Sequence, residues 1–84
     1  MGAHTLSREQ TRAVRTVMRI FAEEDLAHGV PRRARRLCQR CHRERPAAGF
    51  ICYSGASLCN TCATAFELAR LRHTAATVSD WLNA

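Results

Sequence analysis

The sequence has no apolar run approaching the roughly eighteen residues that a membrane-spanning helix needs, and this excludes that class of membrane protein. Residues 1–5 also lack the apolar core of an export signal. We therefore expect a cytoplasmic, intracellular protein with reduced thiols and no membrane partner. Lysine is absent as well, so arginine supplies all thirteen cationic side chains.

The residue patterns of common enzymes are missing too. There is no glycine-rich phosphate loop and no serine, histidine and aspartate arrangement. His42 and Glu44, with the cysteines that follow, partly resemble the zinc-deaminase pattern. Leu58 stands where that pattern has proline, however, and the chain is too short for a deaminase sheet. Neither cysteine pair has the βαβ context of a thioredoxin-like dithiol. We expect no enzyme and no small-molecule substrate, with a catalytic or redox protein as the weakest alternative.

Four cysteines form the most informative pattern in the chain. Cys38 and Cys41 make one Cys-x-x-Cys pair, and Cys59 and Cys62 make a second after seventeen intervening residues. This spacing is typical of a tetrahedral zinc site with four sulfur ligands. An odd total of five cysteines disfavours a framework of disulfides. We predict one structural Zn²⁺, and because sulfur fills every position, no open site for metal catalysis.

The fifth cysteine, Cys52, lies in the middle of a predicted strand, where we expect a buried small hydrophobic residue. A substitute ligand or a redox thiol is the alternative. His42, next to Cys41, is interpreted as a loop residue rather than a ligand. The other histidines show no spacing that suggests a site.

The formal charge of +6 comes from one short segment. Residues 1–31 and 46–84 are each neutral, whereas residues 32–45 hold seven arginines against Glu44 alone. Residues 32–37 form a basic arm before the first cysteine pair. Such an arm can be a flexible, solvated connector or a segment that contacts phosphates. If it binds DNA, the contacts come mainly from arginines to phosphate: Arg32, Arg33, Arg35, Arg36, Arg40, Arg43 and Arg45.

Residues 1–31 are predicted to form an amphipathic helical segment, with the helix itself over 7–28. Ser7 and Gln10 fit a capping box at its start, and Gly29 and Pro31 end it. Apolar residues recur at helical spacing: Val14, Val17, Met18, Phe21, Ala22 and Leu26. We expect this stripe to pack on the zinc module, with a partner or dimer face as the alternative.

Residues 38–73 are predicted to form the zinc finger itself. Phe50–Tyr53 and Ala56–Leu58 have the composition of a hairpin, with Ser54 and Gly55 in the turn. A helix follows with Asn60 as its N-cap, and Phe66, Leu68 and Leu71 are expected to face inward. The tail, residues 74–84, either extends this helix or forms a short new one capped by Thr77 or Ser79. We expect Trp81 to dock on residues 14–21.

The order of knuckle, hairpin, knuckle and helix resembles a treble-clef finger, and residues 54–62 resemble the second half of the GATA-type zinc finger. The matching features are the turn glycine and the Leu58-Cys59-Asn60-Thr61-Cys62 run. The resemblance covers about residues 37–72 and implies structural zinc and DNA binding. The fold class we predict is a small α+β zinc-stabilised domain, a treble-clef finger with an N-terminal amphipathic helix packed on it.

The chain differs from the GATA pattern where that family contacts DNA. Ala47, Ala48 and Gly49 occupy a loop that is basic in the family. The helix face of Ala63, Thr64 and Glu67 offers little to base edges. The leading hypothesis is a small transcriptional regulator that contacts DNA through its arginine-rich segment. The alternative is a zinc-stapled protein-interaction adaptor that docks on a larger regulatory complex or forms a homodimer through its N-terminal helix.

Overall fold

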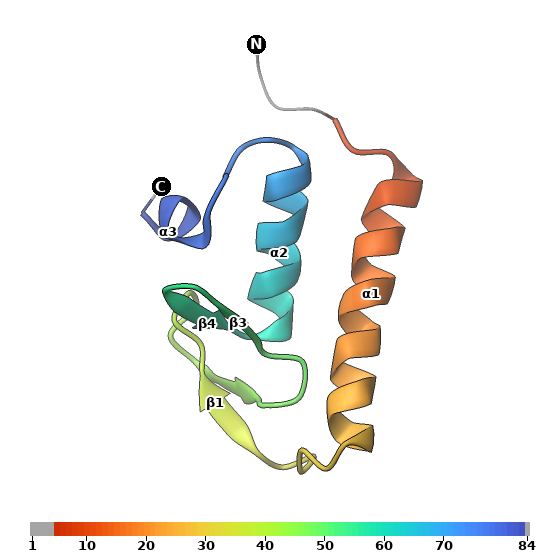
Figure 1. Cartoon of the computed structure of the whole chain (residues 1–84), viewed down its shortest axis with the longest axis vertical. Helices are drawn as coiled ribbons and strands as arrows, with labels where there is room; N and C mark the ends of the chain where they lie inside the picture. The colour runs from red at the N-terminus through yellow and green to blue at the C-terminus, as the bar shows by residue number, and fades with distance from the viewer. Residues whose placement is uncertain (1–4, 84) are drawn as a thin grey trace.

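The computed structural model describes residues 5–83, in which two helices lie side by side and two small hairpins lie near one end of the helix pair (Figure 1). The elements follow in this order: α1 (Arg8–Ala27), β1 (Arg35–Leu37), β2 (Glu44–Pro46), β3 (Ile51–Tyr53), β4 (Ala56–Leu58), α2 (Asn60–Leu71) and α3 (Val78–Leu82). The strands form two separate two-stranded sheets, β1–β2 and β3–β4. This is the predicted small α+β domain with α1 packed on α2. Over the described residues, no helix is both long and apolar enough to cross a bilayer.

The start of α1 confirms the predicted capping box. The Gln10 N–H donates to Ser7 Oγ at 3.0 Å, and Gln10 Oε1 accepts the Ser7 N–H at 2.9 Å. The backbone N–H groups of Ser7 and Gln10, which have no partner within the helix, are therefore both hydrogen-bonded. The helix ends at Ala27, and Gly29 follows with φ of +104°, a left-handed conformation that glycine adopts without a Cβ penalty.

The apolar stripe of α1 is only partly in the core, which corrects the prediction that all of it packs on the zinc module. Met18 is buried and Val14 packs beside it. Val17 and Phe21, in contrast, keep 48% and 43% of their surface exposed, and Ile20 keeps 41%. Helix α2 packs on one side of α1, and this second side remains open.

The first hairpin was not predicted. Strand β1 pairs antiparallel with β2, placing Arg36 opposite Arg45 and Leu37 opposite Glu44. The second half of the basic arm is therefore part of a sheet, and the interpretation of residues 35–37 as a flexible connector is wrong. These three-residue strands are too polar to show the alternation on which strand prediction relies.

The second hairpin is confirmed at β3 and β4, with Gly55 in the turn at φ of +99°. The expected N-cap of α2 is wrong by one residue, because Cys59 caps the helix. The Asn60 side chain has a longer-range role. Its Nδ2 donates to the Met18 carbonyl at 2.9 Å and to the Gly49 carbonyl at 3.2 Å, which ties α1 and the 47–50 loop to α2.

The core lies between α1, α2 and β4. Phe66 and Leu58 are almost completely buried at its centre, and Leu68 is buried at its margin. Leu71 was expected to face inward but remains 43% exposed at the end of α2.

The C-terminal residues form a separate short helix, α3, whose cap is Thr77: its Oγ1 accepts the Asp80 N–H at 3.1 Å. Trp81 does not dock on residues 14–21. Its ring lies 5.6 Å from that of Phe66 and beneath the Arg40 guanidinium at 4.7 Å. Helix α3 thus lies on the opposite side of α2 from α1 (Figure 1).

Candidate metal centre

The four predicted ligand cysteines meet at one point. The Sγ atoms of Cys38, Cys41, Cys59 and Cys62 all lie within 4.8 Å of one another. Four sulfurs bound at about 2.3 Å around a tetrahedral ion stand about 3.8 Å apart, so this cluster needs only a small contraction to close on one metal. Four soft thiolates suit zinc. The cluster can therefore hold one metal ion, and zinc fits its donor set.

The first pair is positioned by the loop that joins β1 to β2. The N–H groups of Arg40 and Cys59 point at Cys38 Sγ, at 3.4 and 3.3 Å. His42 adopts φ of +59° and donates its N–H to the Cys38 carbonyl at 2.9 Å. The chain therefore turns tightly after Cys41 and returns into β2 while both sulfurs stay on the same side.

The second pair belongs to the start of α2. Cys59 Sγ accepts the Cys62 N–H at 3.5 Å, so this thiol caps the helix as well as facing the cluster. Gln39 joins the two pairs. Its backbone N–H donates to the Ser57 carbonyl at 3.2 Å, and its Oε1 accepts the Ser57 N–H at 2.6 Å. These two hydrogen bonds between Gln39 and Ser57 of β4 hold the first cysteine pair in place relative to the second.

The electrostatics of the cluster favour a bound cation. Burial opposes ionisation of Cys38, but hydrogen bonds from the backbone of Cys59, Cys41 and Arg40 outweigh it and lower its pKa to about 6. Burial raises the pKa of Cys62, and hydrogen bonding with Cys59 and Cys38 and their negative charge raise it further. Ionisation of Cys62 next to Cys38 and Cys59 is therefore favoured by a positive ion that compensates the negative charge.

Cys52 lies outside this cluster and is exposed, so the prediction that it is buried is wrong. Ser57 Oγ lies 3.4 Å from its Sγ, and the Arg36 guanidinium lies 3.8 Å away. The hydrogen bond from Ser57, followed by that from Arg36, lowers the pKa of this thiol. His42 is exposed on the loop, as expected, and is not part of the four-cysteine cluster.

The seven arginines of residues 32–45 divide into two groups. Three of them contact other side chains of the chain: Arg36 stacks over Phe50 at 4.9 Å and Arg40 over Trp81, while Arg45 donates to Thr61 Oγ1 at 3.3 Å. The other four are exposed, as Arg36 and Arg40 also are: Arg32, Arg33, Arg35 and Arg43. Within residues 5–83, none of the seven forms an ion pair with an acidic side chain. The ion pairs in this range are Arg19–Glu23 in α1 and Arg70–Glu67 in α2.

Two further arginines were missed as candidates. Arg15 and Arg19 of α1 line a groove of about 500 Å³ whose other wall includes Thr61 and Thr64 of α2. Arg45 reaches Thr61 from the first hairpin. The regular spacing of arginines along α1 could have signalled this surface, but the net neutrality of residues 1–31 concealed it.

No family model, curated protein or solved structure matches this chain. Its site is therefore defined by its own geometry, a cluster of four cysteines spaced as two knuckles and able to hold one zinc ion.

Proposed function

We propose that this protein is a treble-clef zinc finger of GATA-like type. In this proposal it is a small transcriptional regulator that binds DNA. The order of its elements supports this proposal: a cysteine pair within the first hairpin, a second hairpin, and a cysteine pair at the start of α2. The metal is structural in this proposal, because four sulfur ligands leave no position for a substrate or a reactive water.

The observation that carries the proposal is the unpaired positive charge beside the cluster. Residues 32–45 contain seven arginines and one acidic residue. Arg32, Arg33, Arg35 and Arg43 are exposed without a described acidic partner. Exposed guanidinium groups concentrated in one short segment attract phosphate, release its counterions and bind in a salt-dependent way.

Helix α2 is less suited to reading bases. Helix α1 lies along one side of it (Figure 1). Glu67 lines the groove between α1 and β3, where it accepts a hydrogen bond from the Tyr53 hydroxyl at 2.6 Å and pairs with Arg70 at 3.3 Å. A helix must present free polar side chains to the major groove to read sequence. Phosphate contacts by the first hairpin and its preceding arm therefore dominate the proposed interaction.

The test is fluorescence anisotropy with a labelled DNA duplex at several salt concentrations. Removing two phosphate contacts in R32A/R33A should lower the slope of log K against log salt by about 2. The matched control R70A/R72A removes the same charge from the end of α2 and should bind more tightly than R32A/R33A. A wild-type protein without salt-sensitive DNA affinity would refute nucleic-acid binding.

The exposed apolar side of α1 favours a second candidate, a zinc-stapled adaptor that binds another protein. Val17, Ile20 and Phe21 form a surface that phosphate contacts do not require. Binding of a protein by the wild-type chain in the absence of DNA affinity would support this function in place of the first.

A further inference from the structure

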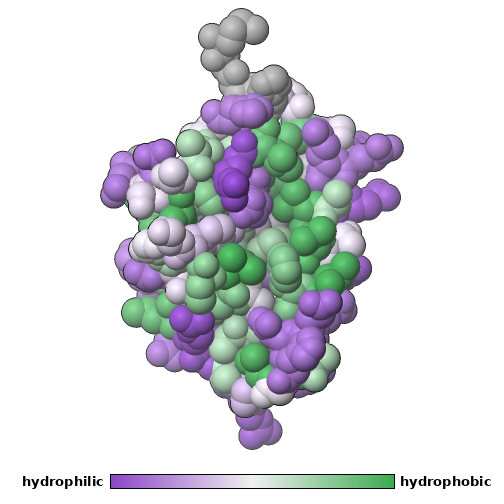
Figure 2. Space-filling view, viewed as in Figure 1, coloured by the Kyte–Doolittle hydropathy of each residue, from purple (hydrophilic) through white to green (hydrophobic). Residues whose placement is uncertain are grey.

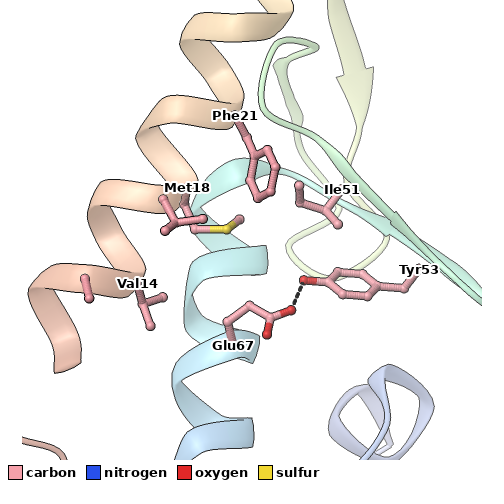
Figure 3. A pocket seen from close by; sticks show the side chains of 8 residues that line it. Val14, Met18, Phe21, Ile51, Tyr53 and Glu67 are labelled. Atoms are coloured by element: carbon pink, nitrogen blue, oxygen red, sulfur yellow. Dashed lines mark hydrogen bonds between the residues drawn. The ribbon is translucent and has the colours of Figure 1, made fainter.

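An apolar groove of about 390 Å³ runs between α1 and β3 (Figure 2). Val14, Met18 and Phe21 of α1 form one wall, and Ile51 and Tyr53 of β3 form the other (Figure 3). Val17 of α1 also lines the groove. Glu67 is the only charged residue in its lining, and its carboxylate is already bonded to the Tyr53 hydroxyl and to Arg70. The groove therefore suits apolar side chains better than a polar small molecule.

The exposed residues of α1 continue this surface beyond the groove. Ile20 lies next to Val17 and Phe21, which line the groove. Each of the three keeps between 41% and 48% of its surface exposed, and together they span little more than one turn of the helix. Scattered apolar residues are ordinary on a protein surface, but a contiguous patch beside an apolar groove is typical of an interaction site.

The charges along α1 indicate what covers this patch. Arg8, Arg12, Arg15 and Arg19 lie in the first part of the helix, against Glu9 alone. Glu23, Glu24 and Asp25 lie near its end, with no basic residue in the last turn. A helix macrodipole favours the reverse order, acidic first and basic last. The charge order therefore opposes the macrodipole of α1, although Asp25 also accepts the Gly49 N–H. It is complementary to the same helix running in the opposite direction.

We propose that a second copy of this chain docks on the patch, with the two α1 helices packed antiparallel about a two-fold axis. At 100° per residue, Arg12 and Glu23 lie about 20° apart around α1, on the side of the apolar patch that Ile20 occupies. They are also equally far from the midpoint between Val17 and Met18. A two-fold axis at that midpoint sets Arg12 beside Glu23 of the second copy, and the contact occurs twice because such an interface is self-complementary.

Within one chain, Glu23 already pairs with Arg19, but this ion pair is weak. Arg19 Nε lies 3.9 Å from Glu23 Oε1, and both side chains are more than 60% exposed. Exposed pairs of this kind contribute little to stability, so Glu23 remains able to pair across the interface. The dimer does not depend on nucleic-acid binding, and its test uses the zinc-loaded protein without DNA.

Sedimentation equilibrium at low salt provides the first measurement. We expect a concentration-dependent mass that approaches twice that of one chain. V17E should shift the protein to monomer, whereas the control L37K, which places a charge at an exposed apolar residue of the first hairpin opposite Glu44, should leave the dimer intact. Zinc content and helical circular dichroism should be unchanged in both variants. A monomer at all concentrations, or a dimer insensitive to V17E, would overturn the proposal.

A charge exchange tests the antiparallel register. R12E and E23R should each weaken the dimer about tenfold, because each creates two like-charge contacts. The double variant R12E/E23R should regain an affinity within about threefold of wild type, because the opposite charges meet again with their positions exchanged. Failure of the double variant to recover would overturn the register, since independent surface effects add rather than cancel.

Discussion

Gly49 should be among the least replaceable residues of this protein, because three segments meet at its backbone. Its N–H donates to Asp25 Oδ2 at 2.7 Å, and its carbonyl accepts from Asn60 Nδ2 at 3.2 Å. Its φ is +89°. The loop between the two hairpins is thereby tied to the end of α1 and to the start of α2, next to the cysteine cluster.

A methyl group at position 49 has no room. The Cβ of alanine would lie 2.8 Å from Asn60 Nδ2 and 2.9 Å from Ala22 Cβ. Ala22 Cβ is fixed to the α1 backbone, and Asn60 Nδ2 is held by the Met18 carbonyl. The positive φ costs about 1–2 kcal/mol for a residue with a Cβ, and overpacking adds about 1–3 kcal/mol. Gly49→Ala should therefore reduce the free energy of unfolding by about 2–5 kcal/mol, a large part of the stability of a small domain.

Gly29→Ala is the matched control. Gly29 also has a positive φ, +104°, but a Cβ there would meet no atom within 4 Å. Both substitutions change the entropy of the unfolded chain alike, so the difference between them isolates the overlap at Gly49, about 1–3 kcal/mol. Urea unfolding at fixed free zinc, followed by Trp81 fluorescence and circular dichroism, measures it. Equal stabilities of the two variants would show that the loop does not lie against Asn60 and Ala22.

Two further predictions concern the cysteines. Cys59→Ala should lose the metal and unfold α2, because metal binding supplies folding free energy in such domains. Cys52→Ala should retain about one zinc per chain. Metal analysis after gel filtration measures both, and zinc retained by Cys59→Ala would contradict the ligand set. In the zinc-loaded protein, Cys52 should be the thiol that alkylates fastest. Its lowered pKa raises the thiolate fraction at neutral pH, so its pH–rate midpoint should lie below that of a free cysteine. Arg36→Ala should move that midpoint upward, and an unchanged midpoint would exclude the Arg36 contact.

The features that could be predicted from the sequence are those encoded by neighbouring residues. The capping box at Ser7, the turn at Gly55 and the two cysteine pairs each need only a few consecutive positions, and the structure contains all of them. The first hairpin could not be predicted in this way. Arg35–Leu37 and Glu44–Pro46 pair because the cysteine loop between them turns back on itself, with His42 in a left-handed conformation that no sequence signal marks.

The errors in predicted burial have a different cause. Cys52 and Phe21 occupy positions that local patterns place inside, yet both are exposed. A domain of 84 residues has too little chain to cover every apolar face. Periodicity shows that a helix has an apolar side, but it does not show how wide a side the rest of the chain covers. The uncovered part of α1 is therefore apparent only in the tertiary structure, and it is the surface on which we propose that a second copy docks.

The same limit applies to the arginines, and it sharpens the proposed function. Residues 32–45 appear uniformly basic in the sequence, but Arg36 and Arg40 are stacked on aromatic rings and Arg45 is bonded to Thr61. Arg43 lies beside the cysteine cluster, which carries a net charge of about −2 once zinc is bound to four thiolates. That negative charge weakens the attraction of Arg43 for phosphate.

Arg32, Arg33 and Arg35 lie before the first cysteine, carry no described acidic partner and have no role in the core. The attraction for phosphate should therefore be strongest at the start of the first hairpin and weaken toward the metal. On this basis, the loss of DNA-binding free energy per arginine removed should be larger in R32A/R33A than in R43A. An equal loss per arginine at the two places would mean that the metal cluster does not shape the field that the nucleic acid experiences.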